Sequence, residues 1–530
     1  MQSVSQAFTD RTSSSMRAID WRLLMSFLKQ FDAGIDFFTI GVSTIGSTDI
    51  IKGDNAVVQE WDKYDYEDFA NRVKSIEWVR EADPPLGAVT LAMADLVLEN
   101  HDDLFTPTNR QSRYYGKLGT GRPVRIYAGF KDTEKIQVFV GLTEGVPVID
   151  EKNKTARFHC IDFMRKLQET ELNEEVILTN SRTDQGISAV LQAGGLITSQ
   201  FSLDTGTVVI PFIYFKKGTK VGDAVRELTE AELGATYMDE NGIIRFNNRT
   251  NWLNKTQVWQ FTDRNMIDRS TPDVSKVINL VEVFSNTRAL EDNQPVFTTG
   301  GSALKFTDDT DFLLAGQSKE AFVNFKDDEG DLPVVNVVSP LAGIRNNSGY
   351  EANSEADGSG ADLTASVGVG SISKFSTAMK MTFTNSGSQT AVISRLEIWG
   401  APARIQDRIY VIQKDTASIT EYEEQPVKIE NNYIQDESAA SSIAQLILED
   451  RAEIDDEREI VIKGVPQLQI GDFVRCVDDR GNNDTYYVKR ISGIIGGDGL
   501  RQTLTIVKRS LTQYFRIGIS TIGGTDAIAP

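Results

Sequence analysis

Residues 123–141 have the sequence Pro-Val-Arg-Ile-Tyr-Ala-Gly-Phe-Lys-Asp-Thr-Glu-Lys-Ile-Gln-Val-Phe-Val-Gly. Its two ends are rich in β-branched and aromatic residues, and a glycine and a charged stretch separate them. Such runs, bounded by turn-forming residues, are typical of β-strands. Similar runs lie on either side, so residues 75–170 are predicted to form a small barrel or sandwich. The β-rich runs are 92–100, 123–129, 136–141 and 154–160.

The following segment, 171–270, combines helical and strand patterns. A stripe at helical spacing predicts one amphipathic helix, with Thr219 as its cap and Gly234 at its end. Residues 236–246 then predict a hairpin, in which Asn241-Gly242 would supply two positive φ angles. The helical stripe consists of Val221, Ala224, Val225, Leu228 and Glu232.

Residues 285–400 are predicted to be an inserted all-β unit. Strands at 379–384 and 390–399 flank an Asn-Ser-Gly turn, and the Gly- and Ser-rich stretch 352–370 is expected to be a long loop. A β-sandwich is the natural interpretation of this pattern.

The last large segment, 405–510, is predicted to be strands around one helix at 438–450. One face of that helix is apolar, with residues Ala440, Ile443, Ala444, Ile447 and Leu448. The strands are expected at 460–462, 472–477, 485–489 and 502–506.

Near the N-terminus, apolar residues at helical spacing predict a further amphipathic helix. It would either dock on a neighbouring molecule or pack on its own domain. The residues of this stripe are Met16, Ile19, Leu23, Leu24 and Phe27.

A short sequence occurs once toward each end of the chain. Phe38-Thr-Ile-Gly-Val-Ser-Thr-Ile-Gly-Ser-Thr-Asp-Ile-Ile51 and Phe515-Arg-Ile-Gly-Ile-Ser-Thr-Ile-Gly-Gly-Thr-Asp-Ala-Ile528 agree at ten of fourteen positions. Solenoids need several contiguous repeats, which this chain lacks. The pair suggests one chain presenting the same surface twice to a partner of higher symmetry. Two similar glycine-containing hairpins are the alternative.

Composition limits the class of function. The chain has 530 residues, enough for about three to four domains. Its net charge is −21, from 76 acidic against 55 basic residues, which disfavours nucleic-acid binding as the main task. No apolar run is long enough for a membrane span, and charged residues interrupt every candidate signal peptide. Two cysteines give no disulfide framework, so we expect a protein made in the cytoplasm.

Candidate catalytic residues are few. The histidines are His101 and His159, and no motif of a hydrolase, a metalloprotease or a P-loop occurs. His159 and Cys160 adjoin in a predicted strand, so their side chains should point to opposite faces. Acidic loops at 307–311 and 326–331 lack the EF-hand pattern, and we expect them to be solvated loops. The chain is therefore expected to have no catalytic residues, no metal and no cofactor.

Four stretches together resemble the tail hub, or baseplate hub, proteins of tailed bacteriophages. Each is weak alone, but their order along one chain is more specific. Related proteins often have glycine after the tyrosine of the third stretch, where this chain has Glu423. The stretches are 94–107 with 121–130 and 139–142; 222–228 with 242–246; 415–422 with 433–436; and 464–474 with 487–491.

The resemblance implies a fold that is mainly β with α+β parts. It would contain two hub-type β-barrels, a helix-plus-hairpin domain and the inserted β-sandwich. The implied divisions are an N-terminal arm with the first repeat copy (1–74), a first barrel (75–170), an α+β domain (171–270), connecting strands with the sandwich (271–404), a closing barrel with one helix (405–510) and a tail with the second copy (511–530).

Hub proteins are trimers, so three chains would present six similar units to a sixfold ring. The implied partners are two further copies, sixfold tail-tube or distal tail ring proteins, tail-tip or central spike or fibre proteins, and phage DNA passing through the lumen without specific binding. The implied location is the tail tip of the virion, after assembly in the host cytoplasm. The repeat copies would contact adjacent ring subunits through Phe38, Ile40, Gly41, Ile45, Gly46, Asp49, Phe515, Ile517, Gly518, Ile522, Gly523 and Asp526.

Two other classes of function compete with a structural one. The 285–400 unit could bind host-surface glycans as an adhesin, with Trp399 and Tyr350 as the main aromatic candidates. A cell-wall or capsule hydrolase would need a diagnostic carboxylate pair, and in so acidic a chain no pair stands out.

Overall fold

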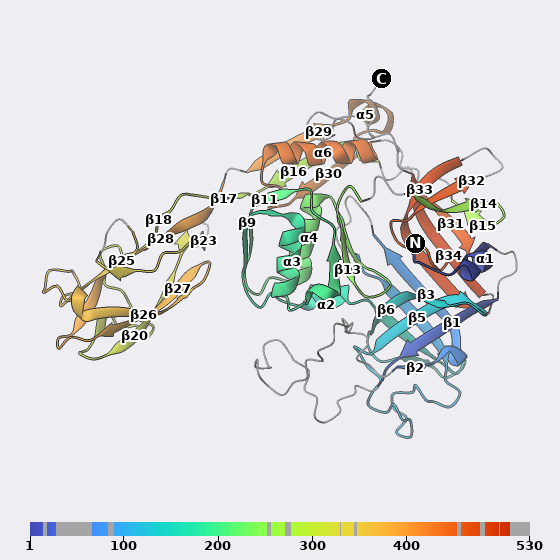
Figure 1. Cartoon of the computed structure of the whole chain (residues 1–530), viewed down its shortest axis with the longest axis horizontal. Coiled ribbons are helices and arrows are strands. Elements are labelled where there is room, and N and C mark those ends of the chain that lie inside the picture. The colour runs from blue at the N-terminus through green and yellow to red at the C-terminus, as the bar shows by residue number, and fades with distance from the viewer. Residues whose placement is uncertain are drawn as a thin grey trace.

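The structure is a computed structural model. It describes residues 1–13, 18–27, 66–82, 90–251, 256–270, 277–328, 330–343, 347–406, 408–452, 457–477, 483–497 and 499–508. The fold is mainly β with α+β parts, as predicted from the sequence. Figure 1 shows a broad strand-rich body, helices beside it, and a smaller β unit that projects to one side. Among the described helices, none has both the length and the apolarity of a membrane-spanning helix.

The largest sheet has fourteen strands and wraps around two hydrophobic cores. Its N-terminal lobe surrounds an aromatic cluster of Phe27, Phe69, Phe105, Tyr114 and Phe158. The strands of this lobe are β1 (Ile19–Met25), β2 (Glu67–Asp68), β3 (Val73–Glu81), β4 (Met93–Glu99), β5 (Pro123–Phe130), β6 (Lys135–Thr143), β7 (Val148–Asp150) and β8 (Thr155–Ile161).

The C-terminal lobe of the same sheet packs around Phe261, Phe473 and Tyr487. Its strands are β14 (Gln257–Thr262), β15 (Met266–Arg269), β31 (Glu457–Lys463), β32 (Phe473–Val477), β33 (Asn483–Gly496) and β34 (Gly499–Lys508). The two lobes belong to one continuous sheet and are joined where β3 pairs with β33. Of the closing barrel predicted at 405–510, only residues from 457 onward lie in this lobe, and β14 and β15 come from the predicted α+β segment 171–270.

The N-terminal segment differs from the prediction. The helix near the terminus is α1 (Gln6–Ser13), and the predicted helix at residues 16–27 is wrong, because residues 19–25 form β1. Strand β1 pairs along its whole length with β5. Every second residue from Leu23 to Phe27 (Leu23, Met25 and Phe27) is buried in the N-terminal core. The segment therefore follows the two-residue period of a strand instead of the helical spacing.

An α+β unit follows, in which helices and short sheets share one core with residues 281–283 and 411–448 (Figure 1). The range 286–408 between these two segments belongs to the projecting unit, which has a core of its own. Its elements are α2 (Met164–Glu169), β9 (Val176–Arg182), α3 (Thr183–Ala193), β10 (Phe201–Leu203), β11 (Val209–Phe215), α4 (Val221–Glu232), β12 (Ala235–Met238) and β13 (Ile244–Asn247). Helix α4 and the β12–β13 hairpin lie where the sequence predicted them.

Two local predictions in this unit were wrong. The N-cap of α4 is Lys220 rather than Thr219, and it makes no side-chain cap. In the hairpin, only Gly242 has a positive φ, of 82°. Asp239 instead orders the turn, because its carboxylate accepts hydrogen bonds from the backbone N–H groups of Asn241 and Ile243.

Next to this unit lies a three-stranded sheet of β16 (Leu280–Ser285), β29 (Ile409–Lys414) and β30 (Pro426–Glu430), with β16 in the middle. Helix α5 (Thr416–Tyr422) follows β29. Helix α6 (Glu437–Arg451) buries all five predicted apolar residues, which confirms the helix expected at 438–450.

The projecting β unit lies between β16 and β29 in the sequence, and two sheets enclose its core. The predicted loop at 352–370 ends earlier than expected, because β26 begins at Val367 despite its glycines. The strands are β17 (Arg288–Leu290), β18 (Gln294–Thr298), β19 (Phe312–Leu313), β20 (Ser318–Asn324), β21 (Lys326–Asp327), β22 (Gly330–Asp331), β23 (Val334–Val335), β24 (Leu341–Ala342), β25 (Gly349–Asn353), β26 (Val367–Lys374), β27 (Ala378–Asn385) and β28 (Ala391–Ile405).

Candidate assembly interface

The two lobes of the large sheet meet at a seam of main-chain pairing. Strand β3 pairs antiparallel with β33 over Ile76–Glu81 and with β4 on its other edge. Trp78 is the cross-strand partner of Gly493, and both are buried. A Cβ atom at residue 493 would lie 2.1 Å from Cζ2 of Trp78, so only glycine leaves room for the indole. The seam therefore depends on one specific pair of residues.

A buried carboxylate, that of Glu240, joins three parts of the chain at this seam. It lies in the β12–β13 turn and accepts a 2.8 Å hydrogen bond from Nη1 of Arg80 on β3. Its other oxygen accepts a hydrogen bond from Nε2 of Gln469, in the C-terminal lobe, at 2.6 Å. Its backbone carbonyl accepts one from Nε2 of Gln137 on β6, also at 2.6 Å. The hairpin of the α+β unit is thereby fixed to both lobes.

Arg80 and Glu240 are both almost inaccessible, with 4% and 2% of their side chains exposed. Burial of charges is costly unless they are paired, and here both the guanidinium and the carboxylate are paired. This ion pair joins β3 to the hairpin of the α+β unit, and a buried pair of this kind adds little net stability of its own.

A second buried carboxylate, Asp162, lies between the N-terminal lobe and α2. It accepts hydrogen bonds from the backbone N–H groups of Ala92, at 2.8 Å, and Met164, at 3.1 Å. Burial raises the pKa of Asp162 to about 7, although these hydrogen bonds oppose the rise. The group titrates near neutral pH and ties the end of β8 to the start of β4.

The predicted interface residues lie outside the described residues. They are Phe38, Ile40, Gly41, Ile45, Gly46, Asp49, Phe515, Ile517, Gly518, Ile522, Gly523 and Asp526. The structure does describe the last residue of each lobe before the corresponding repeat copy. The first copy follows Phe27, in the core of the N-terminal lobe, and the second follows Lys508, at the end of β34. Whether the copies have related surroundings stays a prediction.

The outward face of the sheet continues across the seam without a break in pairing. One row of neighbouring residues runs from Ile494 on β33 through Glu77 on β3 and Asp95 on β4 to His159 on β8. Glu144 lies 3.6 Å from Nε2 of His159, and Asp95 lies 3.2 Å from Nδ1. This row and the neighbouring Glu144 thus present carboxylates and one histidine beside the apolar Ile494.

The histidine and the cysteine considered for catalysis, His159 and Cys160, occupy adjacent positions on β8. His159 is partly exposed while Cys160 is buried, so they point to opposite faces as predicted, and burial raises the pKa of the Cys160 thiol. Among the described residues, no group of three or more His, Cys, Asp or Glu side chains is arranged to hold a metal ion. In the acidic loop at 307–311, Asp308 lies 3.1 Å from Nζ of Lys319.

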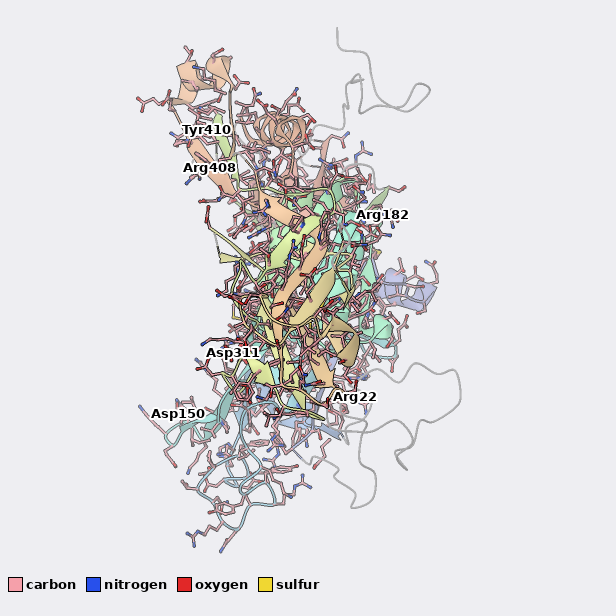
Figure 2. All side chains as sticks on the ribbon, turned by 90° about the vertical axis from the view of Figure 1, so that its left-hand side faces the viewer. Arg22, Asp150, Arg182, Asp311, Arg408 and Tyr410 are labelled. Atoms are coloured by element: carbon pink, nitrogen blue, oxygen red, sulfur yellow. The ribbon has the colours of Figure 1, made fainter. Side chains whose placement is uncertain are left out.

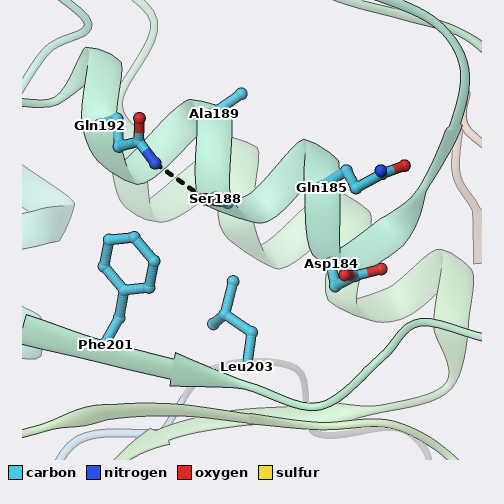
Figure 3. A pocket seen from close by; sticks show the side chains of 7 residues that line it. All are labelled: Asp184, Gln185, Ser188, Ala189, Gln192, Phe201 and Leu203. Atoms are coloured by element: carbon cyan, nitrogen blue, oxygen red, sulfur yellow. Dashed lines mark hydrogen bonds between the residues drawn. The ribbon is translucent and has the colours of Figure 1, made fainter. Parts of the chain in front are cut away.

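One open cavity of about 460 Å³ lies between α3 and β10. Figure 3 shows Phe201 and Leu203 on the strand facing a helix surface of glutamine, serine and alanine. The only titratable residue of its lining is Asp184, which accepts hydrogen bonds from Arg182 and from the backbone N–H of Gly206. This lining offers no nucleophile with an adjacent base.

The two aromatic residues expected to bind glycans differ in exposure. Tyr350 is buried and donates a 2.6 Å hydrogen bond to the carbonyl of Val367, so it belongs to the core. Trp399 is half-buried and donates to Glu397 at 2.8 Å. Neither residue therefore forms an open stacking surface.

Sequence reasoning did not identify Trp78, Gly493, Arg80 or Glu240. The tight turn around Asn241-Gly242 located Glu240 on a hairpin, but nothing local indicated that its side chain would be buried between two lobes. A glycine inside the strand at residue 493 was an available sign of close packing.

No protein-family model matches the chain. No curated protein matches it either. Among solved structures it is similar to the 43 kDa tail protein of prophage MuSo2 from Shewanella oneidensis, with 11% identity, a TM-score of 0.45, and coverage of 83% of this chain and 96% of that one. A tail protein from Neisseria meningitidis MC58 gives 9% identity, a TM-score of 0.46, and coverage of 84% and 94%.

A third similar structure is the prophage tail protein gp18 from Listeria monocytogenes EGD-e. It gives 8% identity, a TM-score of 0.39, and coverage of 85% and 93%. The chain is thus similar to solved tail proteins, two of them from prophages, as the resemblance of its sequence implied.

Proposed function

We propose that this chain is a structural tail protein, a trimeric hub that connects the tail tube to the tail tip or baseplate. The observation that supports this most directly is the continuous sheet with two lobes, joined by β3 and β33. A chain that contributes two similar units to a ring needs them held at a fixed spacing, and hydrogen-bonded pairing supplies this.

The attachment of the repeat copies supports the same proposal. The first copy lies in the sequence between β1 and β2 of the N-terminal lobe, and the second follows β34 of the C-terminal lobe. Each lobe would therefore carry one copy toward its neighbour in a sixfold ring. Three chains would then present six copies to six subunits. The interface residues named above for the two copies are part of this proposal, as are the domain divisions predicted from the sequence.

A hub must let DNA pass without retaining it. We expect the outward face across the seam to line the channel, because it lies on both lobes. Glu77 and Asp95 on neighbouring strands would repel phosphate, and the chain as a whole carries a charge of −21. The proposal needs no catalytic group, and the chain would act in the virion at the tail tip.

The native mass of the purified protein tests this proposal. The chain has a mass of 58.8 kDa, so a trimer would have three times that mass, or 176.4 kDa. We expect light scattering or native mass spectrometry to find the trimer at micromolar concentration. A strict monomer even at high concentration would contradict self-assembly in solution and favour a peripheral adaptor or adhesin.

A further inference from the structure

The sheet of β16, β29 and β30 has one covered face and one open face. Val281, Val283 and Val411 point to the covered side and share a core with Ile443 and Ile447 of α6. Figure 1 shows α6 lying along this sheet. The opposite side, which we call the β29 face, consists of Leu280, Glu282, Phe284, Arg408, Tyr410, Ile412, Lys414, Pro426, Lys428 and Glu430.

Large apolar side chains on the β29 face are open to solvent. Tyr410 is 49% exposed and Ile412 is 47% exposed, on alternate positions of the same strand. The ring of Tyr410 stacks on that of Phe284, with centroids 4.4 Å apart and planes 25° apart. An aromatic stack of this kind is held rigid before any partner arrives, which lowers the entropy cost of binding.

Two cations lie over the same aromatic ring. Cζ of Arg408 is 4.7 Å and Nζ of Lys428 is 4.4 Å from the ring centroid of Phe284. Nη2 of Arg408 and Nζ of Lys428 also lie within 3.5 Å of the carboxylate oxygens of Glu430. Figure 2 shows Arg408 and Tyr410 side by side at the surface. Aromatic residues with arginine are the residue types that dominate binding energy at protein interfaces.

The charge of the β29 face differs from that of the chain. Its three cations, Arg408, Lys414 and Lys428, outnumber its two carboxylates, Glu282 and Glu430, whereas the chain carries −21 overall. Copies of so acidic a chain repel one another, so contact between them is most favourable where one copy presents cations to the acidic surface of the next.

We propose that the β29 face is the contact through which one copy of this chain docks on an acidic surface of the adjacent copy. This rests on the proposed trimer and names the surface that forms it. Tyr410 and Ile412 would be the buried anchors, and the charges around them would set the orientation. The contact would be heterologous, because a ring of three joins two different surfaces of each chain.

Sedimentation velocity of the full chain over a concentration series tests this, using wild type, Tyr410→Asp and Ile412→Asp. We expect the midpoint for dissociation of the trimer to rise about 30-fold or more in each variant, the effect of removing an interface anchor. Leu341→Asp is the matched control, because Leu341 is an exposed leucine on the projecting unit. It should leave the midpoint unchanged.

Hydrogen exchange of the wild-type protein gives a readout that does not depend on variants folding. Amides of residues 409–414 should gain protection as concentration rises through the association midpoint. Trimers in all variants, or no change in exchange at 409–414, would overturn the assignment of this face while leaving the trimer intact. A wild-type monomer at every concentration would instead overturn the trimer itself, and with it this contact.

Discussion

Removing one charge of the buried Arg80–Glu240 pair should destabilise the protein more than removing both. Arg80→Met leaves the carboxylate of Glu240 buried with only the amide groups of Gln469 and Asn241, and Glu240→Gln leaves a buried guanidinium without its carboxylate. Each single change should lower the free energy of unfolding by about 3–5 kcal/mol, the usual effect of leaving one buried charge unpaired.

The double variant Arg80→Met/Glu240→Gln contains neither charge and should lose less than either single variant. The assay is urea unfolding followed by tryptophan fluorescence, with the free energies combined in a double-mutant cycle. Lys305→Met is the control, since its pair with Asp309 is largely exposed, and it should have no measurable effect. If the double variant lost as much free energy of unfolding as the two single variants together, the two charges would not be coupled, and the reasoning would be refuted.

Three further predictions follow from single residues. Gly493→Ala should lower the free energy of unfolding by about 1–3 kcal/mol, because its Cβ would overlap Trp78, and Trp78→Leu in the same chain should partly restore the thermal midpoint. Glu423→Gly should raise the free energy of unfolding by about 1 kcal/mol in urea, because Glu423 has φ 61° and ψ 175°, a region suited to glycine, whereas Glu423→Ala should bring no gain. Burial raises the pKa of Asp162 from its ordinary 3.8 to about 7, so the folded state binds the proton of this carboxyl more tightly than the unfolded state does. The stabilisation that this proton gives the folded state is fully present below pH 3.8 and is lost as the pH rises to about 7. Wild type should therefore lose up to about 1.4 kcal/mol per pH unit across that window relative to Asp162→Asn, and parallel pH profiles of thermal unfolding would count against this.

Sequence predicted the elements whose pattern is local. The apolar face of α6 and the β5–β6 pair follow from spacings within one segment, so the periodicity alone was sufficient. The glycine that related proteins often have after this tyrosine also has a local explanation. Glu423, which stands in its place, adopts a backbone conformation in which glycine is usual. The error at residues 19–25 arose because Ile19, Leu23 and Leu24 satisfy a helical spacing, while pairing with β5 selected the alternating set.

The seam could not be predicted in the same way. Trp78 and Gly493 lie far apart in the sequence, and their contact depends on how two lobes fold against each other. The same holds for Arg80 and Glu240, which belong to different units. A single glycine in a strand, or a single glutamate in a turn, can have many local roles. Only the long-range pairing of β3 with β33 shows that Gly493 and Glu240 lie at the seam.

The pairing of β3 with β33 also limits how the spacing between the lobes can vary. A shift by one residue would turn every side chain of β3 to the opposite face, and Trp78 would leave the core for solvent. The smallest shift that keeps the faces is two residues, or roughly 6.6 Å along the strand. The distance between the lobes can therefore change only by whole two-residue shifts of register. Substitutions along β3 that keep the register leave this distance constant.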